Sequence, residues 1–264
     1  MKNPFFTVEL SEPRFESDNL RLITVKSPAL KKRADITVFV PEVPLSELKG
    51  MVILLHGVYG SHWAWTLKGG VHKTAERFIA ENKLPPMLLV MPSDGLFADG
   101  SGYVPHESED YEKWIVEDVP NVVIEQITGR PLPLFITGLS MGGYGALRLG
   151  AKYPDKFSAF SGHSSVTELG QLRQFAEDFQ GLQSAVQTQE SVLESILQHK
   201  ATLPPFRFDC GREDILIEHN RQLHHSLVRH GIEHQYNEFP GGHEWPYWEE
   251  HIAESLLFFG SLCP

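Results

Sequence analysis

The sequence predicts an α/β fold class, a mostly parallel central sheet flanked by helices, on two observations. Short apolar runs without alternation, such as Met51–Leu55 and Met87–Met91, are typical of strands that are buried on both faces. Between such runs lie longer amphipathic stretches, and the last one places Trp248, Ile252 and Leu256 on one helix face. Strands that alternate with helices form parallel crossovers, so helices should cover both faces of one open sheet.

The remaining elements follow from the same two patterns. Three strands are expected before the alternation begins, antiparallel at one edge of the sheet: Phe6–Leu10, Leu20–Val25 and Ile36–Val40. Later strands are expected at Leu134–Thr137, Phe157–Phe160, Pro205–Phe208 and Gln235–Phe239. Helical spacing of apolar residues is found over Trp65–Ile79, Trp114–Ile127 and Leu216–Leu227.

Residues 164–203 interrupt this alternation. The segment is polar and rich in glutamine, and it contains no convincing strand. It is expected to be a helical insertion between two strands, and insertions above the carboxyl edge of a sheet often cover a site. We therefore predict a single domain over residues 1–264, with a cap-like helical insertion at 164–203 over the site.

Composition excludes several classes of protein. The 264 residues carry 34 acidic and 23 Lys or Arg side chains, a net charge of −11, which disfavours binding to nucleic acid or to anionic membranes. Two cysteines give neither a disulfide framework nor a zinc motif, and the histidines lack metal-ligand spacing, so no metal and no cofactor are expected. No membrane span or export signal is apparent, so a cytoplasmic location is expected. The oligomeric state is not predicted.

A Gly-x-Ser-x-Gly motif, Gly138–Gly142, directly follows the strand expected at Leu134–Thr137. A strand that turns at once into a helix lifts the central side chain, Ser140, above the sheet, and the flanking glycines allow the close backbone approach. The N-terminus of the following helix favours negative charge at the same place. Ser140 is therefore predicted to be a nucleophile.

A serine hydroxyl needs a base, and position discriminates among the 13 histidines. His243 follows the last expected strand in a glycine loop, where its ring can reach over the sheet edge, so it is predicted to be the base. The loop after Pro205–Phe208 offers three acids: Asp209, Glu213 and Asp214. Asp214 is preferred because it lies past a glycine turn and can reach a neighbouring loop, and Asp209 remains an alternative.

Two backbone amides are expected to stabilise the charge that develops on the carbonyl oxygen. One belongs to Met141, which follows the nucleophile. The other is assigned to Val58, in the loop after Met51–Leu55. His56 in the same loop is expected to brace it by hydrogen bonding rather than to act in catalysis.

With Ser140, Asp214 and His243 in this chain order, the sequence resembles the α/β-hydrolase superfamily, and more narrowly the esterase D-like esterases. This group includes feruloyl, acetylxylan and tributyrin esterases, S-formylglutathione hydrolases and mycolyltransferases. The likeness covers the chain from Ile36 onward and rests on four segments: Leu55–Gly57, Gly138–Ala146, Cys210–Asp214 and Pro240–Trp248. It implies the α/β-hydrolase fold and gives the same roles to the following residues: Ser140, Asp214, His243, Val58 and Met141.

The predicted function is that of a serine carboxylesterase that forms an acyl-enzyme. Short-chain, aryl or carbohydrate-linked acyl esters are the expected small-molecule substrates. An acyltransferase or a thioester hydrolase of the S-formylglutathione type would use the same triad. A non-catalytic binding protein on a hydrolase scaffold is the alternative from another class, because a fold does not fix a function.

Overall fold

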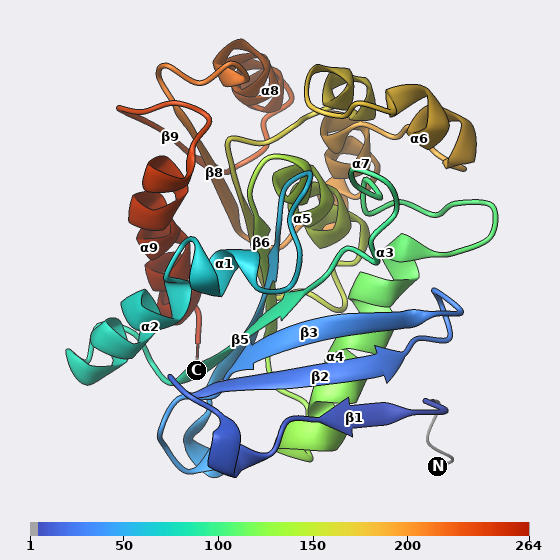
Figure 1. Cartoon of the computed structure of the whole chain (residues 1–264). Coiled ribbons are helices and arrows are strands. Elements are labelled where there is room, and N and C mark those ends of the chain that lie inside the picture. The colour runs from blue at the N-terminus through green and yellow to red at the C-terminus, as the bar shows by residue number, and fades with distance from the viewer. Residues whose placement is uncertain (1–4, 264) are drawn as a thin grey trace.

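A computed structural model describes residues 5–263 of the chain. Within these residues, the fold is built around one nine-stranded sheet (Figure 1). Its strand order is β1-β2-β3-β5-β4-β6-β7-β8-β9. The strands are β1 (Val8–Leu10), β2 (Leu20–Lys26), β3 (Arg33–Phe39), β4 (Gly50–Leu55), β5 (Met87–Pro92), β6 (Leu134–Gly138), β7 (Ala159–His163), β8 (Phe206–Gly211) and β9 (Gln235–Phe239). Pairings from β1 to β3 and between β3 and β5 are antiparallel, and the other pairings are parallel. The predicted antiparallel edge is thus confirmed.

Helices cover both faces of this sheet. They are α1 (Ala64–Leu67), α2 (Val71–Ala80), α3 (Tyr111–Lys113), α4 (Val119–Val123), α5 (Met141–Lys152), α6 (Phe179–Ala185), α7 (Val192–Gln198), α8 (Ile217–Arg229) and α9 (Trp245–Ser261). In Figure 1, α1, α2 and α9 lie together on one side of the sheet, whereas α4 crosses behind β2 and β3. Two clusters of buried apolar side chains fill the two interfaces. The predicted fold class is confirmed.

Short 3-10 and π turns complete the chain. The 3-10 turns are η1 (Pro13–Phe15), η2 (Leu45–Glu47), η5 (Leu169–Gln174) and η6 (Lys200–Thr202). The π turns η3 (Trp114–Asp118) and η4 (Ile124–Thr128) flank α4, so the stretch expected as one helix changes its winding twice. None of the helices within residues 5–263 is long and apolar enough to cross a membrane.

Two elements differ from the sequence prediction. The helix expected over Trp65–Ile79 is two helices, because the chain turns at Gly70, whose φ of 56° lies in the left-handed region that favours glycine. The strand expected at Phe157–Phe160 begins and ends later, at Ala159 and His163. His163 is therefore the last residue of β7, and its side chain is buried.

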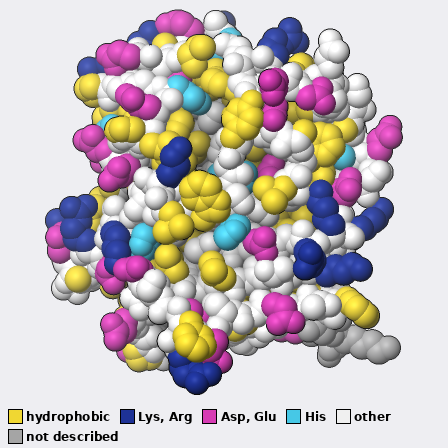
Figure 2. Space-filling model, in the orientation of Figure 1, with side chains coloured by type: hydrophobic (Ala, Val, Ile, Leu, Met, Phe, Trp, Pro, Cys, Tyr) yellow, Lys and Arg dark blue, Asp and Glu magenta, His cyan; other side chains and the backbone are white. Residues whose placement is uncertain are grey.

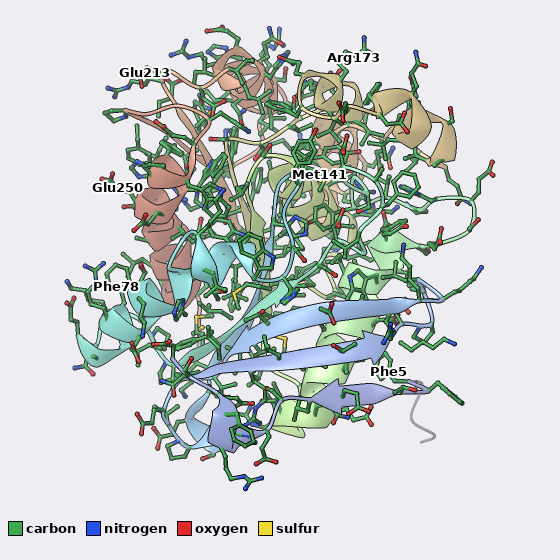
Figure 3. The ribbon with its side chains drawn as sticks, viewed as in Figure 1. Phe5, Phe78, Met141, Arg173, Glu213 and Glu250 are labelled. Atoms are coloured by element: carbon green, nitrogen blue, oxygen red, sulfur yellow. The ribbon has the colours of Figure 1, made fainter. Side chains whose placement is uncertain are left out.

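The carboxyl ends of the parallel strands meet at one edge of the sheet, as expected for such a fold. The loops after β4, β6, β8 and β9 and the segment 164–203 gather there (Figure 1). That segment contains η5, α6, α7 and η6. Figure 3 places Met141 near the centre of this region, with Arg173 of the segment and Glu213 of the loop after β8 above it.

Candidate active site

Ser140 occupies the sharp turn between β6 and α5. Its backbone angles, φ 55° and ψ −117°, are strained for a residue with a side chain. Glycines make the turn possible, because a Cβ at Gly138 would collide with the carbonyl of Gly142, and one at Gly142 with the carbonyl of Leu55. The amide of Ser140 donates to the carbonyl oxygen of His163 at 3.0 Å, which fastens the turn to the end of β7.

The hydroxyl of Ser140 meets the ring of His243, which lies in the loop after β9. Ser140 Oγ and His243 Nε2 are 3.0 Å apart. On the other side of the ring, Nδ1 lies 3.1 Å and 3.0 Å from the two carboxylate oxygens of Asp214. The structure therefore brings together the three side chains that the sequence singled out, from the loops after β6, β8 and β9.

Asp214 is buried, with 2% of its surface exposed. Burial alone would raise the pKa of Asp214, but the His243 ring and the Leu216 amide, which donates at 2.8 Å, together lower it below its usual range. A carboxylate held in its charged form can accept the Nδ1 proton of His243. That proton leaves the lone pair on Nε2 facing the serine hydroxyl.

The loop after β4 runs past the same serine. A Cβ at Gly57 would lie 3.3 Å from Ser140 Cβ, so this loop approaches the nucleophile closely. Its Tyr59 and Gly60 amides donate to Asp99 O and Gly57 O. Among residues 5–263 no acceptor is found for the Val58 amide. The Met141 amide opens α5, where the first amides have no acceptor within the helix.

His56 braces this loop, as expected from the sequence. Its Nδ1 donates to Gly57 O at 2.7 Å, and its Nε2 accepts the Asp94 amide at 2.9 Å. The phenol of Tyr103 donates to the carbonyl oxygen of His56 at 3.0 Å. Both ring nitrogens are occupied, so His56 has no free nitrogen with which to accept a proton from a substrate.

Aromatic side chains line a pocket over Ser140. Tyr59, Trp63, Trp245 and Trp248 are among its lining residues. Figure 2 shows hydrophobic side chains gathered near the centre of this face, with histidines among them. Three further aromatic residues are structural, because their polar atoms donate hydrogen bonds inside the protein: Trp65 to Leu55 O, Tyr103 to His56 O and Tyr247 to Asp209.

Phe175 also lines the pocket, and sequence reasoning missed it. Its ring stacks on the imidazole of His243, with centroids 4.9 Å apart and planes 22° from parallel. It belongs to the segment 164–203, whose polar composition contains no periodic signal that could single out one phenylalanine.

Asp209, the alternative acid, belongs to a different cluster. It is fully buried in β8, where His163 Nδ1 lies 3.0 Å and Arg207 2.9 Å from its carboxylate, and Tyr247 donates to it. Burial alone would raise the pKa of Asp209, but His163, Arg207 and Tyr247 together lower it. All of its neighbours are inside the protein, which favours Asp214 as the partner of His243.

No metal centre is apparent near these residues. Within the described part of the chain, no group of three or more His, Cys, Asp or Glu side chains is arranged to hold a metal ion.

The model of the family described as "Putative esterase" matches residues 27–259. The chain belongs to this family. The esterase is 28% identical to an acetyl esterase of Caldicellulosiruptor saccharolyticus over 267 residues, and the match covers 92% of each chain.

Solved structures share the fold of this esterase. A structure of FphF, a fluorophosphonate-binding serine hydrolase of Staphylococcus aureus, superposes with a TM-score of 0.75 at 24% identity and covers 90% of this chain and 97% of its own. A ferulic acid esterase superposes with a TM-score of 0.79 at 22% identity over 98% of this chain and all of its own. The protein is thus a member of an esterase family and has the α/β-hydrolase fold.

Proposed function

We propose that this esterase hydrolyses carboxylic esters of small molecules with Ser140 as nucleophile, His243 as general base and Asp214 as the acid that orients it. The observation that carries the proposal is the 3.0 Å contact between Ser140 Oγ and His243 Nε2, on a ring held by Asp214. That separation is within reach for direct proton transfer.

In the proposed acylation step, His243 takes the proton of Ser140 as Oγ bonds to the ester carbonyl carbon. The carbonyl oxygen becomes negative and accepts the amides of Val58 and Met141. His243 then gives its proton to the departing alcohol oxygen as the ester C–O bond breaks. Asp214 stabilises the transient imidazolium throughout.

In the deacylation step, water replaces the alcohol. His243 takes a proton from water as its oxygen attacks the acyl carbon, and the same two amides hold the oxyanion. The proton returns to Ser140 Oγ as the carboxylic acid leaves. An added alcohol could take the place of water, so product analysis with such an alcohol separates hydrolysis from acyl transfer.

The lining of the pocket supports short acyl or aryl esters as the substrate class. Tyr59, Trp63, Trp245 and Phe175 present flat apolar surfaces around the nucleophile, and such surfaces bind small planar or apolar groups. The names of two relatives, an acetyl esterase and a ferulic acid esterase, fit this range of acyl groups.

The test is turnover of a panel of chromogenic esters from acetyl to octanoyl, with aryl and acetylated-sugar esters included. Ser140→Ala should lose activity toward every ester by several orders of magnitude, while its far-UV circular dichroism spectrum remains that of the folded protein. Ser184→Ala, at an exposed serine of α6, is the matched control and should keep full activity. Near-normal turnover by Ser140→Ala would refute the proposal.

A further inference from the structure

The ring of His243 is packed between two aromatic side chains. Phe175 stacks on it at 4.9 Å, and the ring of Trp248 stands at 90° to it with centroids 5.0 Å apart. Trp248 comes from α9, which directly follows the His243 loop, whereas Phe175 comes from a distant part of the chain. The stacked position of Phe175 therefore depends on what holds its own segment.

We name residues 175–178, which carry this ring, the strap. The carbonyl oxygen of Phe175 accepts the phenol of Tyr59 at 2.9 Å. One carboxylate oxygen of Asp99 accepts the amides of Glu177 and Asp178 at 2.6 and 3.2 Å. Both ends of the strap are thus held from outside the segment 164–203.

Asp99 and Tyr59 also bond to each other, and this contact holds the loop after β4. The carbonyl oxygen of Asp99 accepts the amide of Tyr59, next to Val58, at 2.9 Å. Asp99 lies in a loop with left-handed backbone angles at Leu96 (φ 55°) and Ala98 (φ 43°), conformations that are unfavourable for such residues unless other contacts fix them. Asp94 supplies such contacts, because its carboxylate accepts the amides of Leu96 and Ser101.

Stacking affects the charged form of His243 in particular. The face of a phenyl ring is negative, so a cation centred within about 6 Å of it is stabilised. His243 becomes a cation when it takes the proton of Ser140 in the proposed mechanism. The charged and titratable groups around it are Asp214 at Nδ1 and Tyr59, Lys68 and Glu244 in the pocket. Phe175 adds a stabilising contact that involves no formal charge.

We propose that Phe175 is a positioning residue for His243: its ring stabilises the imidazolium and fixes the plane of the imidazole, and Tyr59 and Asp99 hold it there through the strap. This inference rests on the proposed function, because it assigns Phe175 an effect on the base of that mechanism. It also gives the segment 164–203 a part in the chemistry besides lining the pocket.

The decisive variants are Phe175→Leu, which keeps an apolar side chain of similar bulk, and Phe175→Tyr, which keeps the aromatic face. Loss of the face makes protonated His243 less stable. In Phe175→Leu, the acid limb of the plot of kcat/KM against pH should therefore move to lower pH, by about half a pH unit. The value of kcat should fall about threefold. Phe175→Tyr should keep the wild-type limb and kcat.

Removal of the strap's contacts provides a second measurement on variants with an intact ring. Asp99→Ala should move the acid limb in the same direction as Phe175→Leu, by a smaller amount. Tyr59→Phe, which loses only the hydroxyl, should do so too. A rise in KM with no movement of the limb in Phe175→Leu would mean that Phe175 only lines the pocket, and it would overturn the inference.

The proposed mechanism and the proposed role of Phe175 can be contradicted separately. If Ser140→Ala is inactive but Phe175→Leu and Asp99→Ala have the wild-type pH profile, only the role of Phe175 is wrong. If Ser140→Ala retains turnover, the proposed mechanism itself is wrong.

Discussion

Among residues 5–263, two Ser–His–Asp arrangements are found, and we propose that only one of them acts on a substrate. In the first, Asp214, His243 and Ser140 are joined at 3.0–3.1 Å. In the second, His163 Nδ1 lies 3.0 Å from Asp209, and its Nε2 lies 2.9 Å from Ser255 Oγ. Residue types and distances are nearly the same, so neither of them explains why one set is the proposed active site.

The difference lies in the surroundings of the two serines. Ser255 is fully buried and also contacts Ser161 and Arg207, so its hydroxyl is occupied inside the protein. Ser140 lies at a strained turn and lines a pocket. Access, strain and the proposed oxyanion donors thus set Ser140 apart, whereas the buried set of Ser255, His163 and Asp209 links α9, β7 and β8.

Substitution of the two histidines should give the largest difference between the two sets. His243→Gln is expected to lower kcat by about five to six orders of magnitude, because the serine loses its base. His163→Gln should leave kcat within about tenfold of wild type but lower the free energy of unfolding by about 2 kcal/mol, since buried partners lose a hydrogen bond. Ester turnover and urea unfolding measure the two effects. Equal losses of turnover would erase the distinction.

The two carboxylates provide the next largest contrast. Asp214→Asn should lower kcat by about 10⁴-fold, because the ring of His243 loses the acceptor that fixes its tautomer. Asp209→Asn should instead lower the free energy of unfolding by about 3 kcal/mol, because Arg207 keeps its charge in the core and loses the carboxylate that balances it. If Asp209→Asn had the larger effect on kcat, Asp209 would be the catalytic acid.

Ser255→Ala sharpens the comparison from the structural side. Loss of the buried hydroxyl should lower the free energy of unfolding by about 1 kcal/mol and leave ester turnover unchanged. Thermal and urea unfolding, together with kcat on one chromogenic ester, measure this. An inactive but stably folded Ser255→Ala would show that the buried set takes part in catalysis.

Acid stability is a property in which the two sets should behave alike, with the smallest effect. The pKa values of Asp214 and Asp209 are both lowered in the folded state by their partners. The unfolded chain therefore binds more protons below about pH 4, and the stabilisation by these pairs is present above that pH and is lost as the pH falls further. Urea unfolding between pH 5 and pH 2 should become less pH-dependent in Asp214→Asn. If the free energy of unfolding of Asp214→Asn depended on pH as strongly as that of the wild type, the lowered pKa of Asp214 would be contradicted.

How far the sequence predicted the site depends on how local each signal is. Ser140 could be found because the strand, the tight turn and the helix that position it are contiguous, and His243 because it follows the last strand. The sequence does not predict the environment of His163, because that depends on where β7 ends and on its register with β8, which pairs His163 with Asp209. Phe175 was missed because its place over His243 depends on tertiary contacts, with Tyr59 holding its carbonyl oxygen and Asp99 holding the amide of Glu177 nearby.

The central claim is that Ser140, and not the buried Ser255, forms the covalent bond with substrate. It is tested most directly by treatment with an organophosphonate that carries a leaving group, followed by intact-mass and peptide mass spectrometry. One adduct per chain is expected, on the peptide that contains Ser140. This adduct should be absent in Ser140→Ala and present in Ser255→Ala. Equal labelling of Ser140→Ala, or an adduct on Ser255, would contradict it.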